Sequence, residues 1–200
     1  MKASRIPAWI LTTLATVLIL TAGALLAALS GIYNVAASKP HSAVFSRVVS
    51  MAMERSVAFH APEISAPDLF DSTLLKHGAG HFKTMCIACH GAPGTEPSEI
   101  GKGLNPEAPE LSEASSEWSD SELHWIIKNG VRMTGMPAFG KSHDDREIWS
   151  LVAFTRAMAG LSPDKYRQLL DTLQGEAHRA VGEPGEKPKA PVPWKRRSLF

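Results

Sequence analysis

The stretch TMCIACHGAPG, Thr84–Gly94, decides how this chain folds. It holds the only two cysteines among 200 residues, Cys86 and Cys89, and His90 follows the second one directly. Residues three apart lie on the same turn of a helix, so both thiols face one side of the chain. The pattern indicates chemistry that uses two thiols and one imidazole together.

The pattern Cys-x-x-Cys-His is the spacing for covalent attachment of a c-type haem. Two thiols on one helical turn can bond to the two vinyl groups along one edge of the porphyrin, and the next residue then points its imidazole at the iron. We therefore predict one covalent haem c with its iron, attached through Cys86 and Cys89, with His90 as an iron ligand.

Three other interpretations of the two cysteines are weaker. A thioredoxin-like redox motif needs a strand–helix pattern around it, which this sequence lacks. A zinc site needs more Cys or His at ligand spacing. A disulfide between residues three apart closes a very small loop and stabilises little.

The second iron ligand is expected in the loop NGVRMTGMPAFG, residues 129–140. A closed, six-coordinate iron transfers electrons, whereas an open site binds gases or does chemistry. Met136 is the strongest candidate, because Gly135 lets the loop approach the ring and Pro137 fixes the backbone beside the ligand. A thioether also favours the reduced iron and raises the potential. Met133 is the rival ligand, and a bis-histidine haem is the fallback.

Other histidines are expected at the surface rather than on the iron. His77 and His81 lie on the predicted helix that leads into the motif. The other three, which are flanked by polar or charged residues, are His124, His143 and His178.

Residues 1–32 are predicted to be a transmembrane anchor or a signal segment. The apolar run Ala8–Leu29 has 22 residues, and as a helix it would be about 33 Å long, enough to cross a hydrocarbon core of about 30 Å. A signal sequence has a shorter apolar region of about 7–15 residues, so we favour an uncleaved anchor. The small residues Ala36-Ala37-Ser38 keep cleavage open. Basic residues flank the run almost equally on both sides, which leaves its orientation open.

Residues 33–67 are expected to form an amphipathic helix, Ser42–Phe59, followed by a linker with two prolines. The helix would lie at the membrane surface, pack on the domain, or serve as a stalk. Its two predicted faces are Phe45, Val48, Val49 and Ala52 on one side and Arg47, Ser50 and Glu54 on the other.

Residues 68–175 are expected to form an all-α domain. Its predicted helices are Asp71–Met85, a helix that begins at the capping box Ser119-x-x-Glu122 and ends at Gly130, a helix capped by Ser142 that runs through Phe154, and Asp164–Gln174, which ends at Gly175. The stretch 91–118 has no helix or strand period, so a bound group is expected to support it. Residues 176–200 read as a disordered, basic, proline-rich tail.

Two groups of residues in this sequence together resemble the motifs of a class I monohaem cytochrome c. The first group is Gly78, Phe82, Cys86, Cys89, His90 and Gly91, and the second is Thr134, Gly135, Met136, Pro137 and Phe139. The resemblance covers about residues 68–160. It implies a fold in which the first and last helices cross, with Gly78 and Phe82 meeting Trp149, Ala153 and Phe154. It also implies that a proline carbonyl accepts a hydrogen bond from the ligand histidine. Pro109 is the candidate, with Leu111 packing on the haem and Pro106 as the alternative.

The resemblance implies a one-electron carrier that is not itself an enzyme. Because bacterial c-type maturation occurs outside the cytoplasm, it also implies a single-pass protein of the bacterial inner membrane with its haem domain in the periplasm. Redox proteins of a respiratory chain are the expected partners, and no nucleic acid is expected. One alternative is a permanently bound subunit of a larger oxidase, reductase or dehydrogenase; another is a haem sensor or enzyme with an open iron site.

The charge distribution gives only a weak indication of the partner. Residues 61–175 carry a net charge of −6 between two basic ends, and the stretch from Glu96 to Glu122 contains eight acids and one lysine. An acidic stretch of this kind is either a solvated loop or a surface that steers a basic partner.

Overall fold

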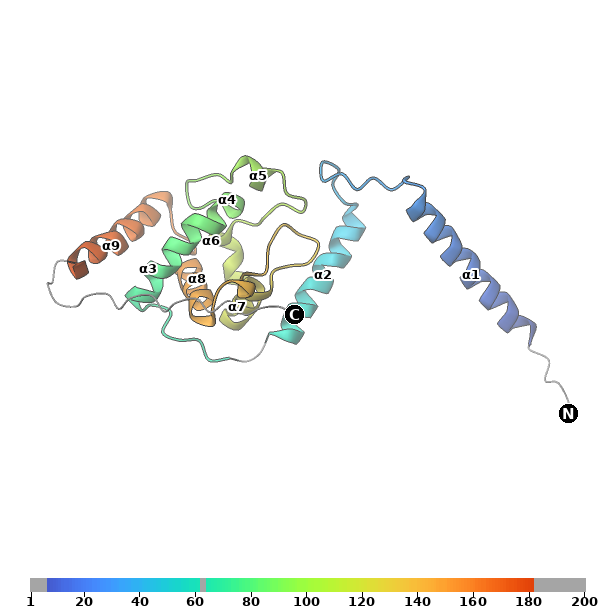
Figure 1. Ribbon diagram of the computed structural model, residues 1–200, viewed down its shortest axis with the longest axis horizontal. Helices are drawn as coiled ribbons and strands as arrows, with labels where there is room; N and C mark the ends of the chain where they lie inside the picture. The colour runs from blue at the N-terminus through green and yellow to red at the C-terminus, as the bar shows by residue number, and fades with distance from the viewer. Residues whose placement is uncertain (1–6, 62–63, 182–200) are drawn as a thin grey trace, which may run out of the picture.

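The computed structural model describes residues 7–61 and 64–181 of the chain. In these residues the structure is helical, and the only β-type contact is an isolated bridge between Ala92 and Thr95. The all-α prediction is therefore confirmed (Figure 1). The α-helices are α1 (Ala8–Leu29), α2 (Ala43–His60), α3 (Ser72–His81), α4 (Ile87–His90), α5 (Glu99–Lys102), α6 (Leu111–Ala114), α7 (Asp120–Asn129), α8 (Asp145–Met158) and α9 (Pro163–Val181). A π-helical turn, η1 (Phe82–Cys86), joins α3 to α4, and two 3₁₀ turns are η2 (Ser115–Glu117) and η3 (Phe139–Lys141).

Helix α1 projects away from the rest of the molecule (Figure 1). It buries no residue against the domain, and it is long and apolar enough to cross a membrane. Its bounds are those of the apolar run in the sequence, because Pro7 precedes it and nothing within the run breaks a helix.

Helix α2 packs against α7 of the domain. Ser42 caps it by accepting a hydrogen bond from the backbone N–H of Phe45 at 3.3 Å. Val57 is 1% exposed, and the ring of His60 stacks on Trp125 of α7 with 6.0 Å between the ring centroids. Of the expected arrangements for this helix, packing on the domain is the one that the structure shows.

The face that α2 turns to the domain is the predicted apolar face except at Val48. Phe45, Val49 and Ala52 line the groove against the domain, and Val57 is buried beside them, whereas Val48 is exposed. The prediction was wrong for Val48 because α2 carries apolar residues on two sides, and periodicity alone cannot say which side has a partner.

The core of the domain is the crossing of α3 and α8. At Gly78 an added Cβ would lie 1.9 Å from the backbone carbonyl oxygen of Ser150, so only glycine permits this approach. Phe82 and Phe154 fill the angle beside it with ring centroids 5.3 Å apart. This is the crossing that the family resemblance implies. The buried core comprises Leu74, Leu75, Phe82, Ala92, Leu123, Ile127, Ile148, Trp149, Leu151, Val152, Ala153, Phe154, Met158, Tyr166 and Leu173.

The starts of α7 and α8 follow local chemistry, with one correction at α8. Ser119 and Glu122 form the predicted capping box of α7. Helix α8, however, is capped by Asp144 in a second capping box with Glu147, not by Ser142. Ser142 instead donates from its hydroxyl to the carbonyl oxygen of Phe139, because η3 occupies the preceding residues.

Helix α9 also differs from its prediction. It continues through Gly175 to Val181, so the predicted stop at Gly175 is wrong; a single glycine inside a helix costs only about 1 kcal/mol. The predicted tail therefore begins with helical residues, and its part from 182 to 200 lies outside the described residues.

The long stretch 91–118 is less irregular than expected. It contains the short helices α5 and α6 and the turn η2, each too short to show a period in the sequence. A second support comes from α8, where Arg156 donates to Asp120 Oδ1 at 2.6 Å and to the carbonyl oxygens of Ser115 and Trp118. The short helices and the hydrogen bonds from Arg156, which we call the Arg156 clamp, therefore hold part of this stretch.

Candidate haem-binding site

The two cysteines lie on one helical turn, as their spacing predicts. Cys86 ends η1 and Cys89 lies in α4. Both thiols are free and half-buried. Burial, and secondarily the neighbouring Cys89, raise the pKa of the Cys86 thiol to about 12. The turn thus presents two unpaired thiols at the edge of the core.

A tight turn ends α4 directly after His90. Gly91 has φ +63°, and a Cβ there would lie 2.6 Å from the carbonyl oxygen of Thr95, so this position requires glycine. Two backbone hydrogen bonds between Ala92 and Thr95 close the turn. The hydroxyl of Ser98 then donates to the carbonyl oxygen of Ala88 at 2.8 Å. The following loop is therefore fixed against residues 86–90, which carry both cysteines and His90 and which we call the attachment turn.

The imidazole of His90 is held by a backbone acceptor. Its Nδ1 lies 2.8 Å from the carbonyl oxygen of Pro109, so Nδ1 carries the proton and donates. Burial lowers the pKa of His90, and the hydrogen bond to Pro109 opposes this shift. A neutral ring with Nδ1 engaged leaves Nε2 as a metal ligand. Pro106, the alternative acceptor, lines a groove against α2.

The loop that carries Pro109 is anchored at its far end. Leu111 begins α6 and packs, partly buried, against the core. The backbone N–H of Gly160 donates to the carbonyl oxygen of Ser112 at 2.9 Å, and Arg156 holds the residues that follow. The sequence gives no sign of this role for Arg156, since it reads as an ordinary exposed cation near the end of a helix.

Met136 lies in the loop between α7 and η3. It is partly buried and packs against the core, and its backbone is fixed at both polar atoms. Its N–H donates to Thr134 Oγ1 at 3.1 Å, and its carbonyl oxygen accepts from the N–H of Val131 at 3.3 Å. Met133, the rival ligand, is 65% exposed and has φ +64°. The structure thus holds Met136 inward and leaves Met133 outside.

Two glycines bring the Met136 loop close to its neighbours. Gly130 has φ +66°, and a Cβ there would lie 2.7 Å from the carbonyl oxygen of Pro137. A Cβ at Gly135 would lie 2.6 Å from the side chain of Leu104. Because Leu104 follows α5, which packs on α4, Gly135 connects the Met136 loop to the loop that leaves the attachment turn.

His124 is not the surface residue that its sequence neighbours predict. It is 4% exposed and stacks on Trp149 with 4.4 Å between the ring centroids. Its Nε2 has no hydrogen-bond partner and lies 3.6 Å from Asp145 Oδ1. Burial lowers its pKa, and the neighbouring Asp145 carboxylate partly opposes this shift. The surface prediction failed because the face of α7 that carries His124 packs on α8. His77 is exposed, as predicted, and His178 has no described side chain.

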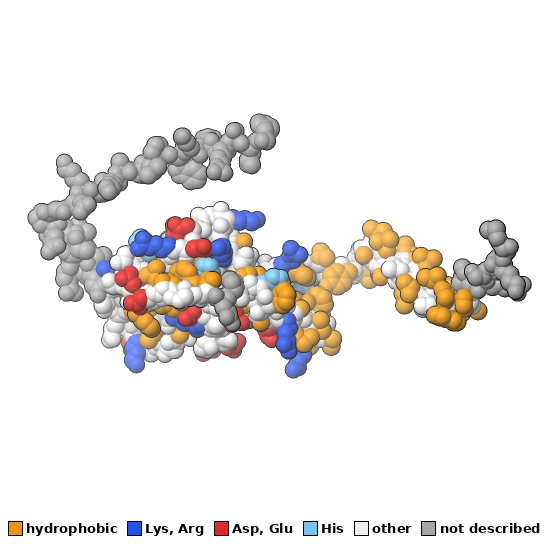
Figure 2. Space-filling view, turned by 90° about the horizontal axis from the view of Figure 1, so that it is seen from below, with side chains coloured by type: hydrophobic (Ala, Val, Ile, Leu, Met, Phe, Trp, Pro, Cys, Tyr) orange, Lys and Arg blue, Asp and Glu red, His pale blue; other side chains and the backbone are white. Residues whose placement is uncertain are grey.

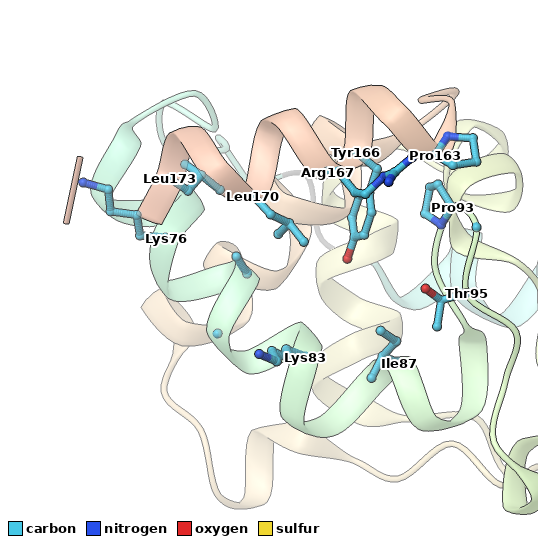
Figure 3. Close-up of a pocket in the computed structure, with 13 residues that line it drawn as sticks. Lys76, Lys83, Ile87, Pro93, Thr95, Pro163, Tyr166, Arg167, Leu170 and Leu173 are labelled. Atoms are coloured by element: carbon cyan, nitrogen blue, oxygen red, sulfur yellow. The ribbon is translucent and has the colours of Figure 1, made fainter. Parts of the chain in front are cut away.

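A groove of about 730 Å³ runs beside the attachment turn, between α3 and α9 (Figure 3). Its floor includes Ile87 of the Cys-x-x-Cys segment, with Tyr166 and Leu170 from α9. Lys83 and Arg167 lie along its sides. The sequence did not reveal this groove, since α9 follows the part of the chain that carries the motifs.

The described part of the chain offers two thiols and an imidazole on one turn, and a thioether on the loop that contacts Leu104. This donor set fits a covalently attached haem. In the same described residues, no three His, Cys, Asp or Glu side chains gather to hold a metal ion by themselves. The bound group would meet His90 and the two cysteines on α4 and its approach, and Met136 on the loop tied to Leu104.

Comparison with known proteins agrees with this arrangement. Residues 73–154 match the protein family described as cytochrome C oxidase, cbb3-type, subunit III. No curated protein matches the chain. The match spans the attachment turn, the Pro109 loop and the Met136 loop, while α1, α2 and α9 lie outside it. Residues 73–154 are therefore a class I c-type cytochrome domain, which carries covalently bound haem c.

Proposed function

We propose that this chain is a membrane-anchored electron carrier in which Cys86 and Cys89 would hold the haem and His90 and Met136 would be the ligands of its iron. The observation that carries the proposal is the 2.8 Å hydrogen bond from His90 Nδ1 to the carbonyl oxygen of Pro109. It orients the ring and leaves Nε2 as the ligand atom. The haem, when bound, supplies an iron that alternates between the ferrous and ferric states.

The surroundings of Met136 suit a permanent ligand. Both its backbone N–H and its carbonyl are engaged within its own loop, and Gly130 and Gly135 pack that loop against neighbouring backbone and Leu104. A ligand held in this way keeps its position when the iron changes charge, which favours rapid electron transfer. A neutral thioether also favours the reduced iron and raises the reduction potential.

The cellular arrangement follows from α1 and from the covalent haem. Helix α1 is the proposed anchor, and the bacterial inner membrane is the proposed membrane. Because bacterial c-type haem attachment occurs outside the cytoplasm, we propose that the haem domain lies in the periplasm. The partners are redox proteins that donate and accept one electron at a time, in keeping with a domain that carries electrons and does not transform a substrate.

A second candidate function is a permanent subunit of a larger membrane complex. The observation that favours it is the family description, which is that of an oxidase subunit. Purification in mild detergent distinguishes the two functions. A free carrier emerges alone, whereas a subunit emerges with stoichiometric membrane partners that withstand a second chromatography step.

The proposed ligands are tested by the absorption spectrum of the purified holoprotein. The ferric protein should show a low-spin spectrum with the weak far-red band of methionine-ligated haem, and Met136→Ala should remove that band and open the reduced iron to carbon monoxide. Met133→Ala is the matched control in the same loop and should leave the spectrum unchanged. Survival of the band in Met136→Ala, or its loss in Met133→Ala, contradicts the assignment and favours another ligand.

A further inference from the structure

Helix α2 has two apolar faces, and the domain covers only one of them. The covered face contains Val57, which is buried, and His60, which stacks on Trp125. The opposite face carries apolar side chains at steps of three or four residues, interrupted by Arg55 between the last two of them, so they form one stripe along the helix. These residues, between 53% and 84% exposed, are Val44, Val48, Met51 and Phe59. We call them the outer stripe.

The outer stripe is unusual for a helix packed on a soluble domain, whose outward face is normally polar. The charged residues within and beside it are mostly basic: Arg55 follows Met51 by one turn, and Arg47 flanks the stripe. A helix whose apolar face has one arginine within it and another beside it has the pattern of one that lies in the interface of an anionic bilayer, where a long side chain carries its charge to the headgroups. In Figure 2, hydrophobic side chains gather on the α2 side of the domain with Lys and Arg beside them, and further hydrophobic side chains cover α1.

The position of α2 relative to α1 supports the same occupant. The chain turns between the two helices, so α2 does not continue the direction of α1 (Figure 1). The connecting segment is itself fixed to the domain, because Asn105 Nδ2 donates to the carbonyl oxygen of Lys39 at 2.9 Å. From Leu29 to Lys39 the chain spans at most about 35 Å. If α1 crosses the bilayer, the domain and α2 are therefore held close to its surface.

We infer that the outer stripe of α2 lies in the lipid interface of the membrane that α1 crosses, and that α2 fixes the haem domain to the membrane surface in one orientation. This inference rests on the proposed anchoring by α1. It adds that the domain does not move freely on a tether. The side of the domain that lines the groove against α2, which includes Val131 and Thr134 of the Met136 loop, faces the membrane. Helix α9, at the opposite end of the domain in Figure 1, faces away from it.

The test uses the full-length holoprotein, purified and reconstituted at high dilution into vesicles of phosphatidylethanolamine and phosphatidylglycerol. A nitroxide is attached to Met51→Cys in the outer stripe, to Leu18→Cys in α1, or to Thr172→Cys on the exposed surface of α9. Cys86 and Cys89 are consumed by the haem, so the introduced cysteine is the only free thiol. The protein is kept in the low-spin ferric state, because reductants of the haem such as dithionite also reduce the nitroxide, and the constant effect of the iron is subtracted with a measurement under nitrogen. The quantity measured is the accessibility of each label to oxygen, which partitions into lipid, relative to a water-soluble nickel chelate.

The expected result is a several-fold higher ratio of oxygen to nickel accessibility at Met51→Cys than at Thr172→Cys, together with a high ratio at Leu18→Cys. A low ratio at Met51→Cys with a high ratio at Leu18→Cys overturns the inference and leaves the anchor standing. Dipolar broadening between two Met51→Cys labels also overturns it, because a second copy would then cover the stripe. A low ratio at Leu18→Cys shows that α1 is not the anchor, and the inference fails with it.

Discussion

His124 is a titratable side chain held between two helices with almost no access to water. Burial lowers the pKa of His124 below the ordinary value of 6.5, so the folded state favours the neutral form of this ring. The unfolded chain takes up the proton more readily as the pH falls. The contribution of His124 to the free energy of unfolding is therefore fully present above about pH 6.5, and it is lost as the pH falls through the pKa of this ring in the folded state.

This effect predicts that the free energy of unfolding of the holoprotein is lower at pH 5 than at pH 7.5, and that His124→Phe reduces the difference. Asp145 does not interfere in this range. Its pKa is lowered chiefly by the hydrogen bond from Lys128, below a value of 3.8. Denaturant titrations at both pH values measure the effect, with exposed His77→Gln as the control for loss of a histidine. An unchanged difference in His124→Phe would show that other groups set the acid response.

At the scale of the elements, the crossing of α3 and α8 depends on a single missing methyl group. Gly78→Ala would place its Cβ 1.9 Å from the carbonyl oxygen of Ser150, a backbone atom that cannot rotate away. We expect a loss of about 3 kcal/mol in the free energy of unfolding. Gly80→Ala is the matched control on the same helix, because nothing lies within 4 Å of its Cβ, and it should stabilise α3 by about 0.5–1 kcal/mol. Thermal unfolding of the two variants measures both; equal effects would mean that the close approach is absent.

The support of the Pro109 loop gives a second prediction at this scale. Arg156 is half-buried and donates to Asp120 and to two carbonyl groups of the loop. Arg156→Gln leaves these acceptors with no charged donor, and we expect it to cost about 2–3 kcal/mol of unfolding free energy. It should also speed amide exchange in residues 112–119.

Arg167→Gln is the comparison for the loss of an arginine, since Arg167 pairs with Asp164 on the exposed side of α9. Such surface pairs contribute about 1 kcal/mol or less. If the two variants unfold alike, or if exchange in residues 112–119 does not change in Arg156→Gln, the loop owes its order to the haem rather than to the clamp.

Elements were predictable where local chemistry decides them. The helix starts at Ser42 and at the Ser119 capping box follow from short-range hydrogen bonds, and Gly78 and Phe82 follow from the family pattern. Burial of His124, the cap at Asp144 and the clamp by Arg156 depend on which elements meet, and a single sequence does not contain that information. The outward position of Val48 on α2 was missed for a related reason: the helix has apolar residues on two sides, and only the tertiary contact tells them apart.

At the scale of the whole molecule, α2 is the joint between the anchor and the haem domain. Val57 and His60 are the residues of α2 that enter this contact most closely, and Trp125, on which His60 stacks, belongs to the helix that leads into the Met136 loop. A movement of α2 would therefore change its packing on the side of the domain that lines the groove. The strength of this joint decides whether the anchor orients the domain or merely tethers it.

This joint can be opened by one substitution. Val57→Asp places a carboxylate at a position that is 1% exposed, and fully burying a valine side chain is worth about 1.5–3 kcal/mol. We therefore expect amide exchange in α2 to accelerate by about tenfold or more, since 1.4 kcal/mol corresponds to a factor of ten. The haem spectrum should not change, because α2 contributes neither the attachment cysteines nor the proposed ligands.

Ala58→Asp, one residue further on the exposed side, carries the same charge without entering the contact and should leave exchange in α7 around Trp125 as it is. Equal exchange in the two variants would mean that α2 is not docked on the domain in solution, and the anchor would then act as a simple tether.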